Sequence, residues 1–263
     1  MALSFPFLMH ELLAIGALHL GHCRRESQNY YFTQATELQS QALVAFNTSQ
    51  KEVDASSCGA IFVFSCLLSL HVLADPLRTS GLDATQYLDH VLNCLKLMGS
   101  VRRLVIKDWW DYLRDTELKP LFPVQLPGEP YDGIPDECKE LANLTRESNL
   151  GDQAHKVCDK ATERIQWIYA VSEIPPRPHF TVHWLLAWPI QLQGEYLDSL
   201  GQRQPEALVI LAYFAVVMHY FRASWVVGDS GSLLIRALDA HLGPRWAKWM
   251  AWPVRMISTE VEE

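Results

Sequence analysis

The longest apolar run of the chain, Ala207 to Met218 (ALVILAYFAVVM), limits the folds that are open to it. The run is too short to cross a bilayer, which takes about 20 residues. It also has no polar side to turn toward water, so a helix formed by it must be surrounded by other elements. The run therefore predicts a central helix that is buried on all sides.

Helical spacing of apolar residues continues through most of the remaining sequence, and β-strand patterns are scarce. One inward stripe is predicted on the first helix, formed by Leu8, Leu12, Ile15 and Leu18. Further helices are predicted at 60–73, 83–99, 101–113, 181–191, 205–221 and 230–241. Asp83 and Ser230 are the expected N-caps, and Gly99 is an expected helix end.

The fold class predicted from these patterns is all-α, as a single bundle of about ten helices. The 263 residues are enough to bury a substantial core, and we expect one domain over 1–263. The segment at about 119–137 holds five Pro and two Gly, which predicts an irregular loop.

Charge and cysteine usage exclude some classes of function. The net charge is −8 and the basic clusters are short, which argues against nucleic-acid binding by this chain. None of the six Cys has the C-x2-C spacing of a zinc site, so no metal and no structural disulfide is predicted. Because no Lys or Arg precedes Arg24, we predict an intracellular protein, cytoplasmic or nuclear, rather than a secreted one.

The segment Gly228 to Gly231 reads Gly-Asp-Ser-Gly, the residues that surround the nucleophile of trypsin-like proteases. His22 even precedes Ser230 in the order of those enzymes. Their site, however, is built on β-barrels, and here Ser230 leads directly into a helical pattern. We interpret the segment as a tight entry into a helix, so the chain is not predicted to be a serine hydrolase.

Other polar residues stand in apolar or aromatic surroundings, where two interpretations are open. They fit hydrogen-bonded core residues, or an acid/base set that faces a cavity. The set comprises His71, His183, His219, Tyr220 and Asp229. The aromatic cluster with Trp184 and Trp188 is likewise core or the wall of an apolar ligand cavity.

Four features of the C-terminal half resemble the regulatory domain of fungal zinc-cluster transcription factors. They are Trp188-Pro189, the helix from Pro205 to Val217, Trp225 before a turn at Gly228, and a closing Trp252-Pro253. The sterol uptake control protein family is the most similar group. The N-terminal SFPFLMHELLAIGALHL also resembles the first regulatory helix of that family.

The resemblance implies an internal hydrophobic pocket near the C-terminal helices, which takes a sterol- or terpenoid-like molecule. In sterol-control members, loss of the ligand frees the protein to activate transcription. By position, the pocket residues implied for this chain are Met218, Phe221, Trp225, Val226, Gly228 and Gly231. No cofactor is implied, and a homodimer is an open option.

Two departures from the family leave alternatives open. The family turn commonly reads Gly-Trp-Gly, where this chain has Asp229-Ser230 between glycines, and the six clustered cysteines of the DNA-binding half are absent. The chain is then a part of a longer regulator or a free-standing relative. A free-standing relative could be a cofactor-independent cyclase, isomerase or pericyclase of natural-product metabolism, or a scaffold for partner helices.

Overall fold

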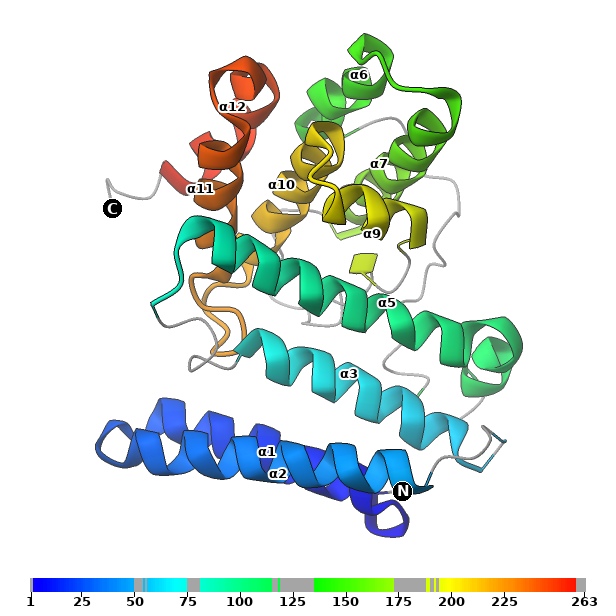
Figure 1. Cartoon of the computed structure of the whole chain (residues 1–263), viewed down its shortest axis with the longest axis vertical. Helices are drawn as coiled ribbons and strands as arrows, with labels where there is room; N and C mark the ends of the chain where they lie inside the picture. Colours follow the sequence, from blue (N-terminus) through cyan, green and yellow to red (C-terminus); the bar gives the residue numbers. More distant parts are fainter. Residues whose placement is uncertain are drawn as a thin grey trace. The chain divides into compact units, whose positions relative to one another are not determined.

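The computed structural model describes residues 2–49, 54, 56–74, 81–114, 118, 135–172, 188–189, 192 and 194–258, without the side chains of 100–114, 171 and 172. Within these residues the chain forms ten α-helices, four short 3-10 helices and no β-strand (Figure 1). The all-α prediction is therefore confirmed. No described helix is long and apolar enough to cross a membrane.

The contacts within the chain divide it into two compact units. Unit 1 comprises Met1–Gly81 and Ser100–Phe122, and unit 2 comprises Leu82–Gly99 and Pro123–Glu263. The boundary between residues 99 and 100 falls inside one helix, α5 (Ala84–Arg114). Because a cluster of contacts does not establish independent folding, the single domain over 1–263 stays a prediction.

The continuity of α5 corrects the predicted helix end at Gly99. The helix runs through this glycine without a break. A Cβ built on Gly99 would lie 2.8 Å from Cδ1 of Leu197, closer than carbon atoms pack. The Leu197 side chain of α9 (Gly194–Gly201) thus occupies the space beside this glycine, and the helix does not end there.

Unit 1 contains α1 (Pro6–Cys23), α2 (Gln28–Ser49) and α3 (Cys58–Ala74), and α1 packs against both of the others. One ring from each helix meets in the core. The centroid of Phe7 lies 5.4 Å from that of Phe46 and 5.2 Å from that of Phe64, and Phe46 stacks on Phe64 at 4.9 Å. Such ring contacts fix the helices more specifically than aliphatic burial alone.

The inward face of α1 differs from the predicted stripe. Leu8 and Leu18 are buried as expected, but Leu12 is 40% exposed. The turn that Leu12 was expected to fill is occupied instead by Glu11, which is 0% exposed. The spacing is helical, as predicted, but between Leu8 and Leu18 the buried positions are Glu11 and Ala14, each one residue before the predicted Leu12 and Ile15.

Unit 2 is arranged around α10 (Pro205–Tyr220), whose residues from Glu206 to His219 are all buried. It is contacted by α6 (Lys139–Glu147), α7 (Asp152–Ser172), α9, α11 (Ser230–Leu242) and α12 (Ala247–Ser258) (Figure 1). The prediction of a helix buried on all sides is confirmed. Most of the Pro-rich loop, 119–134, lies outside the described residues, and its end at Asp136–Cys138 is a 3-10 turn.

Asp83 caps the start of α5, as predicted. Its carboxylate accepts a hydrogen bond from the Gln86 backbone N–H at 2.9 Å, and the Gln86 side chain accepts one from the Asp83 N–H at 3.0 Å. This reciprocal arrangement is a capping box. It satisfies two backbone donors at the helix start.

Candidate functional site

The predicted site residues fall into three groups. Trp184 and His183 lie outside the described residues. His71 belongs to unit 1, whereas Trp188, the residues 218–221 and the turn 225–231 belong to unit 2. The predicted acid/base set is therefore not gathered within one unit, and its catalytic role stays a prediction.

The C-terminal end of α10 leads into a compact turn at 221–229. Met218 is 2% exposed and Phe221 is 9% exposed, while Trp225 and Val226 are partly buried. Gly228 has φ +46°, a left-handed conformation that glycine adopts without strain. The turn thus combines buried apolar side chains with a backbone path that requires glycine.

Gly231 lets α11 cross α10 at very short range. A Cβ on this residue would lie 2.6 Å from the carbonyl oxygen of Ala215 and would also strike the backbone of His219. Tyr87 of α5 adds a hydrogen bond from its hydroxyl to the carbonyl of Ser230 at 3.1 Å. Gly231 therefore has a packing role, and its predicted contact with a ligand is a separate proposal.

The structure corrects the predicted cap at Ser230. The helix α11 begins at Ser230, so Asp229 occupies the N-cap position, and its side chain makes no capping hydrogen bond. The hydroxyl of Ser232 donates to the Asp229 carbonyl at 2.9 Å. Asp229 is exposed. The Gly-Asp-Ser-Gly segment is thus the start of a helix, as its pattern indicated, but displaced by one residue.

Trp188 lies in the core of unit 2. Its ring stacks on Phe214 with centroids 4.6 Å apart and meets the edge of Tyr196 at 5.7 Å. Its indole N–H donates to the carbonyl of Ala161 at 3.3 Å. A fully buried indole with its donor satisfied fits the core interpretation that the sequence left open.

A second aromatic cluster, which sequence reasoning missed, is formed by Tyr169, Tyr213 and Trp252. Trp252 stacks on Tyr213 at 5.0 Å and meets the edge of Tyr169 at 5.7 Å. The Tyr169 hydroxyl donates to the backbone carbonyl of Tyr213 at 2.9 Å. The Tyr213 side chain is 0% exposed, yet its own hydroxyl has no hydrogen-bond partner.

Burial controls the chemistry of these phenols. Burial raises the pKa of Tyr213 well above the ordinary value, and it also raises the pKa of Tyr169. Electrostatic interactions with Cys138, Tyr220 and Tyr213 raise the pKa of Tyr169 further. Both phenols are therefore protonated at neutral pH and can donate hydrogen bonds. Tyr220, one of the predicted residues, lies seven positions after Tyr213 on α10, which is the same helix face.

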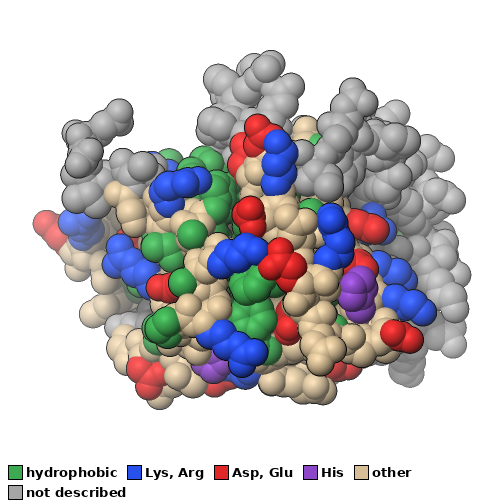
Figure 2. All heavy atoms as spheres, turned by 90° about the horizontal axis from the view of Figure 1, so that it is seen from above, with side chains coloured by type: hydrophobic (Ala, Val, Ile, Leu, Met, Phe, Trp, Pro, Cys, Tyr) green, Lys and Arg blue, Asp and Glu red, His purple; other side chains and the backbone are tan. Residues whose placement is uncertain are grey.

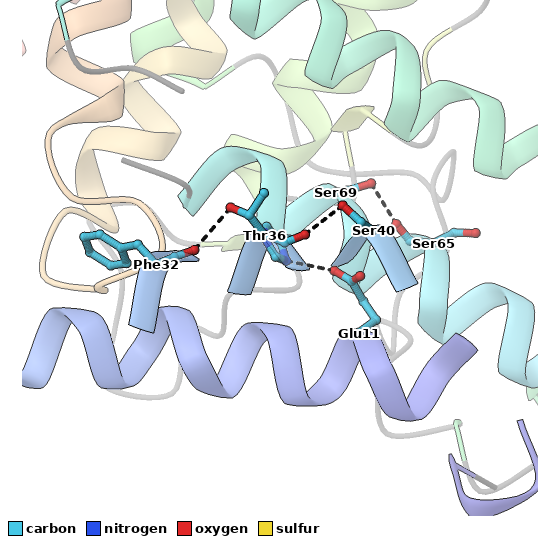
Figure 3. A network of polar contacts seen from close by, with 7 residues as sticks. Glu11, Phe32, Thr36, Ser40, Ser65 and Ser69 are labelled. Atoms are coloured by element: carbon cyan, nitrogen blue, oxygen red, sulfur yellow. Dashed lines mark hydrogen bonds and ion pairs between the residues drawn. The ribbon is translucent and has the colours of Figure 1, made fainter. Parts of the chain in front are cut away.

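His71 has a partner that its sequence position did not reveal. Its Nδ1 lies 3.1 Å from Oε1 of Glu11, which is labelled in Figure 3, and both side chains are 0% exposed. The same view shows the Ser69 hydroxyl donating to the Ser65 carbonyl at 2.8 Å. Sixty residues separate the members of the pair, so no local spacing could have indicated it.

Charged side chains of both signs lie at the surface of the described residues. Basic and acidic side chains are interspersed on the face drawn in Figure 2. The Nζ of Lys248 lies 2.7 Å from Oε2 of Glu147. Within the described parts of the chain, no group of three His, Cys, Asp or Glu could hold a metal ion.

Comparisons with known proteins add no assignment, since no family model, curated protein or solved structure matches this chain. The candidate site therefore rests on its own geometry.

Proposed function

We propose that this chain binds a hydrophobic small molecule, sterol- or terpenoid-like, in unit 2, as the regulatory domain of a fungal transcription factor. The observation that carries the proposal is the buried Tyr213 hydroxyl, which has no hydrogen-bond partner. Leaving a buried hydroxyl unpaired costs about 1–3 kcal/mol. A ligand oxygen that accepts this hydrogen bond would recover that free energy on binding.

The surroundings of Tyr213 favour a ligand with a flat apolar body. Tyr169 and Trp252 present ring faces and edges beside it. Trp252 is only partly buried, so its side chain can move aside without the loss of a fully buried core residue. Apolar surface with a single polar anchor is the usual composition of a small-molecule site.

Of the pocket residues implied by the resemblance, Met218 lies on the same helix, and four others lie in the turn that follows it, namely Phe221, Trp225, Val226 and Gly228. Met218 follows Tyr213 by five residues, which is about 7.5 Å along α10. Five residues also turn the helix by about 500°, so a ligand anchored at Tyr213 would have to extend partly around α10 to reach Met218 and the turn at 221–229. The two lines of support, one from chemistry and one from resemblance, therefore concern neighbouring parts of one element.

The binding part of this proposal is tested with two probes that differ only in oxygen. Cholesterol carries a hydroxyl and cholestane does not. We expect cholesterol to raise the melting temperature of the protein and to remain bound in native mass spectrometry. The affinity for cholestane should be lower by tenfold or more, because cholestane cannot form the hydrogen bond with the buried Tyr213 hydroxyl. Tyr213→Phe should remove the preference. No binding of either probe, and no apolar molecule extracted from the purified protein, would refute the proposal.

The regulatory part needs a separate measurement. The chain would be fused to an unrelated DNA-binding domain, and a reporter gene would be followed in cells with normal and depleted sterol. We expect transcription to change on depletion in the wild-type fusion and to be insensitive in the Tyr213→Phe fusion. If reporter expression does not change on sterol depletion although the purified chain binds sterol, the binding proposal stands and the regulatory role is refuted.

The alternative function, a cofactor-independent cyclase, isomerase or pericyclase, is supported by the same phenols. A protonated hydroxyl held in place in a dry site can polarise a substrate carbonyl, which is catalysis by electrostatic preorganisation. Tyr213 would donate to the substrate, and Tyr220 would assist from the same face. The test is to incubate the protein with an extract of apolar fungal metabolites and to follow new products by mass spectrometry. Unchanged product formation in Tyr213→Phe would defeat this assignment.

A further inference from the structure

The last turn of α1 carries two metal-ligating side chains that touch each other. The Sγ of Cys23 lies 3.5 Å from the Nε2 of His19, which precedes it by four residues. A zinc ion binds sulfur at about 2.3 Å and imidazole nitrogen at about 2.0–2.1 Å in a tetrahedron, which places two such ligand atoms about 3.6 Å apart. The two side chains are therefore spaced as neighbouring ligands of one zinc ion.

A similar pair on α5 shows what distinguishes this one. His90 and Cys94 have the same sequence spacing, and their Nε2 and Sγ atoms lie 3.7 Å apart. Cys94 is only 2% exposed, whereas Cys23 lies at the surface. Of the two pairs, His19 with Cys23 is the one that a second molecule can reach.

One chain supplies only half of a zinc site. Structural zinc takes four protein ligands, and in the part of the chain that the structure describes no three His, Cys, Asp or Glu could hold a metal together. A second copy that meets the first across a two-fold axis adds another His19 and another Cys23. Two thiolates and two imidazoles around one zinc ion complete a Cys2His2 site without net charge.

The helix face that holds the pair suits a second copy of itself. Leu12, Gly16, His19 and Cys23 are all exposed and follow one another at intervals of four, three and four residues, which is the spacing of a coiled-coil seam. No atom lies within 4 Å of a Cβ built on Gly16, so a partner helix can approach the backbone there. The single acidic or basic residue of α1 is Glu11, which is buried, so like charges on this helix do not oppose pairing.

The charges that follow α1 are of both signs. Arg24 donates a hydrogen bond to the Tyr31 hydroxyl at 2.9 Å within its own chain. In η2 (Arg25–Ser27), Arg25 and Glu26 are both exposed, so each can meet its opposite on a second copy. Pairing at this end of α1 therefore does not bring together charges of one sign alone.

We propose that His19 and Cys23 of two copies of this chain bind one zinc ion, which joins the copies through their α1 helices in parallel. Each thiol releases its proton to the solvent as its sulfur binds the metal. The contact between Sγ and Nε2 within each pair is replaced by one bond from each atom to zinc. Leu12 and Gly16 of the two copies then pack in the same seam, so dimerisation depends on the metal.

The test uses the full chain, freed of metal, in a reducing agent that prevents disulfides between exposed thiols. Zinc is added, bound zinc is counted by native mass spectrometry, and the molar mass is followed by light scattering. We expect one zinc ion for two chains, a doubled mass, and return to single chains when a chelator is added. Cobalt in place of zinc should give the visible absorption bands of a tetrahedral ion with thiolate ligands.

Four variants at exposed positions separate the ligands from their surroundings. Cys23→Ser and His19→Ala each remove two of the four ligands of the dimer, so the affinity for zinc should fall by about 100-fold or more. Leu12→Glu keeps the ligands but places like charges in the seam, so dimerisation should require about tenfold more protein. His22→Gln is the matched control beside Cys23 and should behave as the wild type.

Three outcomes would overturn the proposal. They are absence of zinc binding, zinc bound to single chains, and a zinc-dependent dimer that persists in Cys23→Ser or His19→Ala. These measurements concern α1 in unit 1, whereas the sterol test concerns Tyr213 in unit 2. The zinc site and the proposed function therefore succeed or fail separately.

Discussion

Trp252 lies over Tyr213 with ring centroids 5.0 Å apart and ring planes 25° from parallel. The indole is partly buried, while the phenol beneath it is fully buried. One side chain thus covers a hydrogen-bond donor that the protein itself leaves unused. This arrangement predicts how the two tyrosines of the cluster respond to loss of their hydroxyls.

Tyr213→Phe and Tyr169→Phe should differ in sign. Removing the Tyr213 hydroxyl deletes an unpaired buried group, so the free energy of unfolding should stay the same or rise by about 1 kcal/mol. Removing the Tyr169 hydroxyl breaks its 2.9 Å bond to the Tyr213 carbonyl and should lower that free energy by about 1 kcal/mol. Urea unfolding of the ligand-free protein measures both. Equal losses in the two variants would contradict the account.

Gly231→Ala should destabilise unit 2. The added methyl group would lie 2.6 Å from the Ala215 carbonyl oxygen, so α11 must shift away from α10. Overpacking of this kind costs about 1–3 kcal/mol. The matched control is Gly16→Ala on α1, where an added Cβ would have no atom within 4 Å. This substitution should stabilise the helix by about 0.5–1 kcal/mol, because alanine has the higher helix propensity. Thermal unfolding compares the two, and a neutral Gly231→Ala would mean that the helices do not cross this closely.

Asp83→Ala and Asp229→Ala compare two N-cap positions with the same residue type. Asp83 accepts a hydrogen bond from the Gln86 N–H, whereas Asp229 makes no capping bond. Asp83→Ala should therefore cost about 1 kcal/mol, and Asp229→Ala should cost a few tenths at most. Denaturant titration of both variants tests this. An equal cost would show that Asp229 stabilises α11 in some other way.

The cysteines should differ in reactivity toward a thiol reagent. Cys23 is exposed, whereas burial raises the pKa of the Cys158 thiol to about 12. Because the thiolate is the reactive form, Cys158 should stay unmodified in the folded protein at pH 8. Its labelling rate should rise little when the pH is raised to 10. Iodoacetamide labelling followed by peptide mass spectrometry measures both sites. Unfolded protein, in which both react, is the control.

The sequence predicts the helices well because their signals are local. The apolar run at 207–218 has no polar side, which by itself indicates burial. The capping box of α5 is formed by Asp83 and Gln86, which lie within four residues of sequence. Where local signals are ambiguous the predictions are wrong. Gly99 is a good helix end by residue type, but the helix continues through it, and Leu197, almost one hundred positions away, occupies the space beside it.

The candidate sites depend on contacts that no local pattern contains. Glu11 reads as an interruption of an apolar helix until His71 is placed beside it. Tyr213 reads as one more aromatic residue of a buried run, because a sequence does not state which hydroxyl finds a partner. The prediction of function from resemblance depends on the binding test, since neither the fold class nor the comparisons with known proteins decide it.

The path of α5 sets an order of events during synthesis. Its first half belongs to unit 2 and its second half to unit 1, so the chain passes from unit 1 to unit 2 and back before it finally completes unit 2. On the ribosome, residues 84–99 emerge well before α10, the helix around which their own unit is built. During synthesis, residues 84–99 are therefore exposed before the rest of unit 2 has been made. For the same reason, no single truncation of the gene yields either unit complete and alone.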